Sequence, residues 1–114
     1  MRIALFALMG LIAGPAFADG ADTFNTKCGD CHSVEPDSSP VAPSLKGVVG
    51  RKIASLADFT YSDALKAKGG TWTEQALNDF LADPRVFAPG ATMLNGAPDP
   101  ADRKAIIDYL KTQK

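Results

Sequence analysis

The chain has 114 residues, of which 46% are apolar and 22% are charged, and it contains two cysteines. This length limits it to one domain and excludes a multi-domain enzyme. Its 12 basic and 13 acidic residues give a net charge of −1, which provides neither the basic surface typical of nucleic-acid binding nor a polybasic patch for a membrane. Two cysteines are too few for a disulfide framework.

The first 18 residues have the composition of a secretory signal peptide. Fourteen of them are apolar, and Arg2 is the only charged residue among them. The apolar run over residues 3–13 is too short to span a bilayer as a helix. An Ala-Phe-Ala sequence follows at residues 16–18, and small residues in this pattern are typical of a cleavage site. We therefore predict a signal peptide over residues 1–18.

Cleavage after Ala18 leaves a mature domain of residues 19–114, exported to the periplasm without a membrane anchor. The alternative is an uncleaved anchor or a buried N-terminal helix, against which Asp19-Gly20 breaks the apolar run. The mature domain has 38 apolar residues, of which 13 are alanine. Its core is therefore thin, and small domains of this kind usually need a disulfide, a metal or a cofactor.

A short helix containing Thr23, Phe24 and Lys27 is predicted to run into a Cys-x-x-Cys-His motif, Cys28-Gly29-Asp30-Cys31-His32. This motif is typical of covalent attachment of a c-type haem. Two thiols about one helical turn apart can add to the two vinyl groups of one haem. The adjacent His32 is then carried beneath the porphyrin, where its imidazole can be an axial ligand of the iron.

A cysteine pair of this spacing also occurs in redox sites and in zinc sites. A thioredoxin-like redox pair requires a βαβ setting, which the sequence does not predict. A structural zinc site requires four ligands, and the mature domain offers only Cys28, Cys31 and His32 as cysteine or histidine ligands. A chance occurrence of the motif is the remaining alternative, but here the motif coincides with an export signal and a thin core.

Residues 33–60 are rich in proline, serine and glycine and show little periodicity, so we predict an unusually long loop. Such a loop is typical of a chain that wraps around a bound group. Further helices are predicted over residues 62–68, over residues 73–83 and from Pro100 to about Thr112. No segment alternates with the period of a strand. The predicted fold class is all-α, with three main helices and a short one.

Capping residues predict where these helices begin and end. Gly69-Gly70 stops the helix over residues 62–68. Thr73 is a suitable N-cap for the next helix, and Pro84 ends it. Asp99 is a suitable N-cap for the last helix, with a proline at the first helical position.

Elimination leaves few candidates for a second axial ligand. His32 is the only histidine, so two histidine ligands are excluded. Met1 and Met9 lie in the predicted signal peptide, which leaves Met93 as the only methionine of the mature domain. Met93 follows Pro89-Gly90, a pair of residues that favours a tight turn of the backbone. On composition alone Met93 is a core-filling side chain. With a haem in place it is the favoured distal ligand, and a lysine or a water molecule is the alternative.

Several blocks of this sequence, in the same order, resemble class I c-type cytochromes of the cytochrome c and bacterial cytochrome c2 branch. The resemblance covers nearly the whole mature domain and is more specific than the Cys-x-x-Cys-His motif alone. It implies a cytochrome c fold wrapped around one covalently attached haem. It also implies that Gly20 and Phe24 pack against Tyr109 and Leu110, where the first and last helices cross. The blocks are Gly20 and Phe24, residues 28–32, 42–45, 47–52, 59–61, 66–72 and 84–93, and Tyr109-Leu110.

The resemblance further implies roles for individual residues in binding the cofactor. Pro43 offers its carbonyl oxygen to the Nδ1–H of His32, which fixes the tautomer and strengthens the ligand. Arg51, Tyr61 and Trp72 hydrogen-bond or neutralise a buried haem propionate. Tyr61 and Trp72 fit equally well as core aromatics with satisfied polar tips, and one side chain can do both.

Three positions near the predicted Met93 ligand depart from the family pattern. Phe80 stands in place of a tyrosine, Leu65 in place of an asparagine and Ala91 in place of a threonine. Each change makes the pocket drier or less hydrogen-bonded. Together they affect the reduction potential and the strength of the bond between the iron and Met93.

The lysine ring that the family places around the exposed haem edge is thin in this sequence. Lys27 and Arg85 stand at matching positions, whereas Val86 and Thr92 occupy positions that are often lysine. A partner can still dock on a local basic rim, because steering depends on the local field. The alternative is that Lys27 and Arg85 are ordinary solvated surface.

We expect an exported, monomeric electron carrier, not an enzyme, with His32 and Met93 as axial ligands of an iron that cycles between Fe(II) and Fe(III). Electrons are expected to pass through the exposed haem edge near Lys27 and Arg85. The expected partners are respiratory or photosynthetic complexes or a periplasmic dehydrogenase. Two alternatives remain: a haem subunit of a periplasmic oxidoreductase complex, and a haem sensor or peroxidase with a labile distal ligand.

Overall fold

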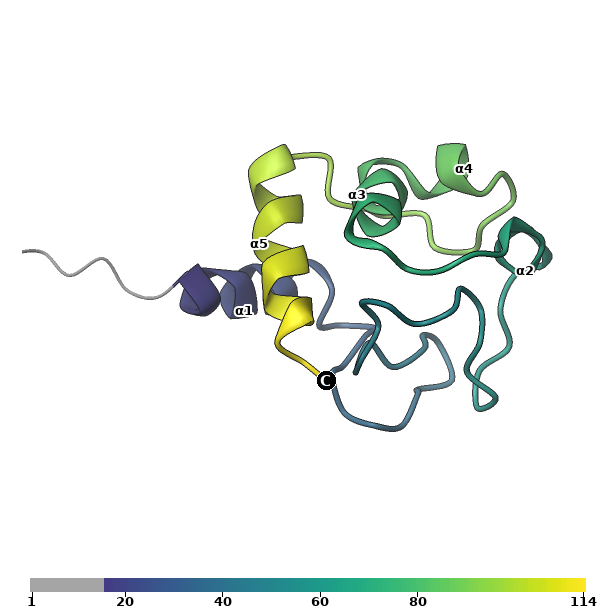
Figure 1. The fold of residues 1–114 in the computed structure, drawn as a ribbon, viewed down its shortest axis with the longest axis horizontal. Helices are drawn as coiled ribbons and strands as arrows, with labels where there is room; N and C mark the ends of the chain where they lie inside the picture. The colour runs from purple at the N-terminus through teal and green to yellow at the C-terminus, as the bar shows by residue number, and fades with distance from the viewer. Residues whose placement is uncertain (1–15) are drawn as a thin grey trace, which may run out of the picture.

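The computed structural model describes residues 16–114, which form a helical domain. Residues 1–15 of the expected signal peptide lie outside the described residues, so the signal peptide and its cleavage remain predictions. Within residues 16–114 the only β pairing is an isolated bridge between Lys52 and Thr71, and no helix is long and apolar enough to cross a membrane. The helices are α1 (Ala16–Lys27), α2 (Asp63–Lys68), α3 (Glu74–Ala82), α4 (Pro84–Phe87) and α5 (Pro100–Lys111) (Figure 1).

Helix α1 is longer than the sequence predicts, because it continues through Asp19 and Gly20. These two residues interrupt the N-terminal apolar run, but they do not interrupt the helix. A glycine inside a helix costs only about 1 kcal/mol relative to alanine. The tertiary contact that α1 makes at Gly20 offsets this cost.

That contact is the crossing of α1 and α5 (Figure 1). A β-carbon built on Gly20 would lie 2.6 Å from the carbonyl oxygen of Ala105 and 2.9 Å from Cβ of Tyr109. One turn later the ring of Phe24 packs against the ring of Tyr109, with centroids 5.4 Å apart. Leu110 belongs to the same buried cluster as Phe24. The crossing confirms the expected contact of the first and last helices, and its closeness requires glycine.

Side-chain caps begin α3 and α5 at the predicted places. The hydroxyl of Thr73 accepts a hydrogen bond from the backbone N–H of Ala76 at 3.0 Å. The carboxylate of Asp99 accepts one from the backbone N–H of Ala101 at 2.8 Å. Both helices therefore follow directly after their predicted N-caps.

The four-residue helix α4 was not predicted from the sequence. Pro84 ends α3 as expected, but it also begins α4, because a proline fits the first position of a helix. The carboxylate of Asp83 accepts a hydrogen bond from the backbone N–H of Arg85 at 3.1 Å and so caps α4. A helix this short has no apolar period from which it could be predicted.

The segment 33–60 contains no helix, as predicted, and hydrogen bonds between distant residues hold it in place. The carboxylate of Asp58 accepts hydrogen bonds from the backbone N–H and the hydroxyl of Ser38, each at 2.8 Å. The backbone N–H of Trp72 donates to the carbonyl of Arg51, also at 2.8 Å. In Figure 1 this segment lies across the domain from α3 and α4. Val48 and Ile53 of this segment are buried members of the core cluster.

The core is small, in agreement with the composition. Its largest aromatic cluster consists of the rings of Trp72, Phe80 and Phe87. The Trp72 ring lies 5.2 Å from the Phe80 ring and 5.7 Å from the Phe87 ring, measured between centroids. Trp72 and Phe80 also line a cavity, so the core is built around a space large enough for a ligand.

Candidate functional site

A cavity of about 500 Å³ is lined by the end of α1, the segment 33–60 and helices α2, α3 and α5. This volume lies within the range of about 300–1,000 Å³ usual for small-molecule and cofactor sites. The structure brings together around this cavity all eight residues predicted to bind the cofactor. They are Cys28, Cys31, His32, Pro43, Arg51, Tyr61, Trp72 and Met93.

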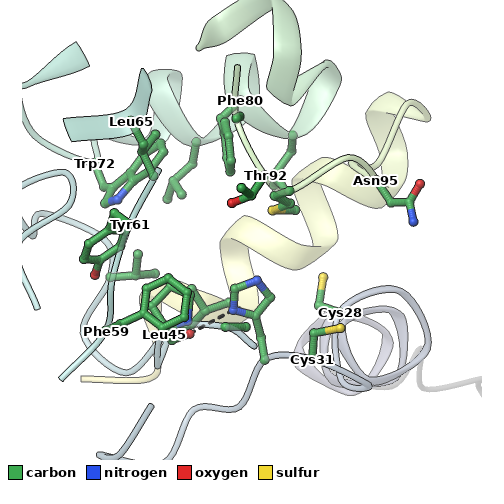
Figure 2. A pocket seen from close by; sticks show the side chains of 18 of the residues that line it. Cys28, Cys31, Leu45, Phe59, Tyr61, Leu65, Trp72, Phe80, Thr92 and Asn95 are labelled. Carbon is green, nitrogen blue, oxygen red and sulfur yellow. Dashed lines mark hydrogen bonds between the residues drawn. The ribbon is translucent and has the colours of Figure 1, made fainter. Parts of the chain in front are cut away.

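The two cysteines lie in the turn that follows α1, at one end of the cavity (Figure 2). The backbone N–H groups of Cys31 and His32 donate hydrogen bonds to the carbonyl of Cys28 at 3.2 and 2.9 Å, which holds the turn. The two thiols are not bonded to each other. Burial raises the pKa of the Cys28 thiol to about 11, and the charge of Lys27 opposes this shift. The turn therefore presents two thiols to one cavity.

His32 has a defined tautomer and a free coordinating nitrogen. Its Nδ1 lies 2.9 Å from the carbonyl oxygen of Pro43 (dashed in Figure 2). Because a carbonyl oxygen can only accept, Nδ1 carries the hydrogen and Nε2 keeps its lone pair. Burial lowers the pKa of His32, and the hydrogen bond to Pro43 opposes this shift. The imidazole is therefore neutral at neutral pH, as a metal ligand must be.

Met93 lines the same cavity from the segment between α4 and α5, and its side chain is half-buried. It is the only methionine of residues 16–114. The segment turns at Gly90, whose φ of 97° is in the left-handed region that favours glycine. The backbone N–H of Ala91 donates to the carbonyl of Ala88 at 2.9 Å. A closed turn thus holds the thioether at the cavity.

The three departures from the family pattern all line the cavity. Phe80 and Ala91 are buried, with 8% and 7% of their surface exposed, and Leu65 is half-buried. Figure 2 shows Phe80 and Leu65 on the wall opposite the two cysteines. These three positions supply no hydroxyl or amide to the cavity, whereas the neighbouring Thr92 also lines it.

Arg51 has an unsatisfied polar atom at the cavity. Its Nη1 and Nη2 donate to the backbone carbonyls of Lys46 and Ser44, at 3.1 and 2.9 Å. Its Nε is buried and has no hydrogen-bond partner among residues 16–114. Burial lowers the pKa of Arg51, while the nearby Tyr61 and Asp58 oppose this shift. A buried guanidinium nitrogen without a partner fits an anionic group such as a carboxylate.

Tyr61 and Trp72 face the cavity from the end away from the cysteines (Figure 2). Both are buried, with 9% and 6% of their surface exposed. The hydroxyl oxygen of Tyr61 accepts a hydrogen bond from the backbone N–H of Leu56 at 3.3 Å. Its O–H is left to donate, so Tyr61 can serve both the core and a ligand in the cavity.

These features fit a covalently attached haem. Paired thiols at one end match the two vinyl groups, and a neutral imidazole with a free Nε2 matches an axial ligand. The half-buried thioether of Met93 offers a second possible ligand atom, and the unpartnered Arg51 Nε of a cavity-lining side chain matches a propionate carboxylate. The apolar wall suits a porphyrin ring.

The alternative uses of the cysteine pair find no such support. The structure contains no βαβ unit within residues 16–114, since its only β pairing there is one bridge. In that same part of the chain, no group of three or more histidine, cysteine, aspartate or glutamate residues is placed to hold a metal ion.

The two cations expected at the contact surface lie in different places. Lys27 lines the cavity, and its Nζ lies 3.6 Å from Oδ2 of Asp102. Arg85 lies instead in a separate open hollow, which it shares with Leu94. Two large apolar residues at the cavity, Val41 and Leu94, were not singled out from the sequence. A single apolar residue in a loop carries no periodic signal.

Comparisons with known proteins agree over nearly the whole described domain. The family model for cytochrome c matches residues 17–114. Cytochrome c2 iso-2 from Magnetospirillum molischianum is 47% identical over 90 residues, which are 78% of this chain and 93% of that protein. Cytochrome c2 iso-2 from Magnetospirillum fulvum is 46% identical over 83% of this chain and 99% of that protein. The structure of cytochrome cH from Methylobacterium extorquens is similar with a TM-score of 0.76 and 44% identity, over 83% of this chain and 96% of that chain.

Proposed function

The chain belongs to the cytochrome c family, and from this membership we propose that it is a periplasmic electron carrier with one haem c, ligated by His32 and Met93. Haem c, when bound, supplies an iron that changes between Fe(II) and Fe(III) and so accepts and releases one electron. The observation that carries the proposal is that Cys28, Cys31, His32 and Met93 all line the same cavity. If His32 and Met93 both bound the iron, no position would stay open for a substrate, which would favour electron transfer over catalysis.

Cys28 and Cys31 are proposed to attach the haem through two thioether bonds. Each thiol would add across one vinyl group of the haem, and such an addition would release nothing. His32 binds through Nε2, while its Nδ1–H donates to Pro43 and keeps the ring in place. Arg51 directs its unpartnered Nε to a propionate.

Tyr61 and Trp72 are proposed to complete the binding of the propionates from the end of the cavity away from the cysteines. Their burial supports this role, because a propionate held among buried side chains is shielded from water. The charge of Arg51 then compensates a carboxylate that would otherwise be costly to bury.

The proposed location of the carrier rests on its N-terminal sequence. We propose that residues 1–18 are removed during export and that residues 19–114 act in the periplasm as a monomer. The redox partners are then respiratory or photosynthetic complexes or a periplasmic dehydrogenase. The similarity to bacterial cytochromes c2 over most of the chain supports this location.

The test is optical. The protein is matured with haem in a bacterial periplasm, and its oxidised and reduced spectra are recorded with and without carbon monoxide. A low-spin spectrum, a weak far-red band from the bond between Met93 and Fe(III), and no reaction with carbon monoxide are expected. The variant Met93→Leu should lose the far-red band and bind carbon monoxide. Val86→Ala changes an exposed apolar residue that does not line the cavity, so it is the matched control and should keep the native spectrum.

One observation favours a second function, a haem sensor or peroxidase with a labile distal ligand. Phe80, Leu65 and Ala91 line the cavity and offer Met93 no hydroxyl or amide. A high-spin spectrum, or ready binding of carbon monoxide by the native protein at neutral pH, would replace the carrier with this second function. Stable co-purification with a dehydrogenase would instead make the chain a subunit of an oxidoreductase complex.

A further inference from the structure

The dipeptide Asn95-Gly96 lies a short distance along the chain from Met93. The side chain of Asn95 is exposed, and it also lines the cavity proposed to hold the haem. In Figure 2 its amide group points away from Phe80 and Thr92. Within residues 16–114 this amide makes no hydrogen bond. It is therefore accessible for a reaction.

The residue after Asn95 has to be glycine, because its backbone packs closely against α3. A β-carbon at Gly96 would collide with the carbonyl of Leu81 and would lie 3.1 Å from Cδ of Pro84. The backbone N–H of Ala97 donates to the same carbonyl of Leu81 at 2.7 Å, which fixes the chain beyond Gly96. The N–H of Gly96 itself has no hydrogen-bond partner in the described part of the chain. This nitrogen is therefore not engaged by the fold.

An asparagine followed by glycine places an electrophile beside a nucleophile. The side-chain carbonyl carbon of Asn95 and the backbone nitrogen of Gly96 can close a five-membered ring, and closure within one chain avoids the cost of bringing two molecules together. Glycine has no side chain that would shield its nitrogen. Closure requires rotation about the single bonds of Asn95. Because Leu94 and Asn95 are both exposed, this rotation displaces solvent and not core side chains.

We propose that Asn95 is a self-modification site, at which deamidation through the Gly96 nitrogen places a carboxylate on the wall of the cavity. The Gly96 nitrogen bonds to Cγ of Asn95, and the amide nitrogen leaves as ammonia with the hydrogen of Gly96. A water molecule then opens the succinimide ring at one of its two carbonyl groups. The product is aspartate, or isoaspartate with the main chain running through the former side chain. No oxidant or reductant takes part.

The modification adds one negative charge two residues after Met93. Asp83 and Arg85 are the charged residues that share a hollow with Asn95. The carboxylate of Asp83 already accepts a hydrogen bond from the backbone N–H of Arg85 at 3.1 Å. The guanidinium of Arg85 forms no ion pair within residues 16–114, so it can attenuate the new charge. The remaining field stabilises Fe(III) over Fe(II) and lowers the reduction potential. This consequence rests on the proposed electron-carrier function.

The modification is measured on the native haem-loaded protein. The protein is kept in warm, mildly alkaline buffer, and its intact mass and peptide map are followed with time. Asn25 and Asn78 are internal controls, since they are the other asparagines of the sequence and lie inside α1 and α3. The side chain of Asn78 also accepts a hydrogen bond from Nε of Arg103 at 2.9 Å. We expect Asn95 to become a mixture of aspartate and isoaspartate while both controls stay intact.

Three results would overturn the modification site. The first is an Asn95 that stays intact, and the second is equal conversion of Asn25, Asn78 and Asn95. The third is aspartate without isoaspartate, because that product indicates direct hydrolysis without a ring. Asn95→Gln keeps an amide but requires a six-membered ring, which closes less readily. The modification at position 95 should be lost in this variant, and its persistence would also contradict the mechanism.

The effect of the charge is measured with Asn95→Asp, which carries the product carboxylate from the start. Its reduction potential should be lower than that of the native protein. Gln75→Glu is the matched control, because it makes the same change from amide to carboxylate at an exposed residue of α3 that does not line the cavity. Its potential should stay close to the native value. Equal potentials of the two variants would contradict the effect on the haem.

The optical spectrum separates this proposal from the proposed function. A high-spin spectrum of the native protein rejects the electron-carrier function, while the peptide map still measures the modification of Asn95. A native low-spin spectrum combined with an intact Asn95 rejects only the modification site.

Discussion

The closest approach of the two terminal helices provides a test of the fold. In Gly20→Ala the new β-carbon would lie 2.6 Å from the carbonyl oxygen of Ala105 and 2.9 Å from Cβ of Tyr109. Real β-carbons essentially never come within 3.0 Å of a heavy atom that is distant along the chain, and ordinary van der Waals contact begins near 3.4 Å. Both obstacles belong to the body of α5 and cannot rotate away. The helices must therefore separate, which also loosens the ring contact between Phe24 and Tyr109.

The expected cost combines two opposing effects. Overpacking of a well-packed site lowers the free energy of unfolding by about 1–3 kcal/mol. The better helix propensity of alanine raises it by up to about 1 kcal/mol. We expect Gly20→Ala to lower the free energy of unfolding by about 1–2 kcal/mol, which corresponds to a Tm lower by about 5–15 °C for a domain of this size. The assay is guanidinium unfolding of the haem-loaded protein, followed by far-UV circular dichroism.

The matched control is Asn25→Ala, an exposed position of the same helix. It gains helix propensity without a new contact, so its stability should stay within about 0.5 kcal/mol of the native value. If Gly20→Ala unfolds at the same guanidinium concentration as Asn25→Ala or later, the close crossing of α1 and α5 is wrong.

Three further predictions concern other parts of the chain. Hydrogen bonds from Ser38 lower the pKa of Asp58. The ionised carboxylate therefore stabilises the fold fully at pH values above the ordinary aspartate pKa of ~4. This stabilisation is lost as the pH falls through the lowered pKa. Asp58→Asn should therefore be less stable than the native protein at neutral pH, and unfolding curves of the two should converge in acid. Gly96→Ala would force a β-carbon against the carbonyl of Leu81, and the same guanidinium assay should show a loss of about 2–3 kcal/mol. The intact mass of the exported protein should correspond to one haem and an N-terminal Asp19, and any other N-terminus would reject the predicted cleavage site.

The fold could be predicted from the sequence wherever a local signal exists. Thr73 and Asp99 cap α3 and α5 because an Asp or Thr side chain can reach the free N–H groups of the next turn. Pro84 was predicted only as a stop, because nothing in the sequence indicates that Asp83 caps a second helix directly after the first. The bonds between Ser38 and Asp58 had no signal either, because the two residues are far apart in a loop without periodicity.

The candidate site could be predicted for a different reason. Cys28, Cys31 and His32 lie within five consecutive residues, so one short segment indicates the chemistry. Met93 is the only methionine of the predicted mature domain, which made it the favoured distal ligand over a lysine or a water molecule. The geometry of Arg51 could not be predicted in the same way. Its two terminal nitrogens bond to backbone carbonyls of its own loop, and only Nε remains for a ligand. That division depends on the path of the loop, which no pattern of residue types specifies.

The loss of a hydroxyl at Phe80 has a structural counterpart that the sequence did not indicate. The Phe80 ring lies 5.6 Å from the Phe87 ring and 5.2 Å from the Trp72 ring, and Nζ of Lys68 lies 4.3 Å from the centroid of Phe87. Aromatic pairs of this kind contribute about 0.5–1.5 kcal/mol each beyond the burial of their surface. Phe87 is the last residue of α4 and leads into the turn that carries Met93. Ring packing therefore holds the segment that carries Met93, at the place where the family pattern has a hydroxyl. The absence of that hydroxyl at Phe80 is thus compatible with a firmly held Met93.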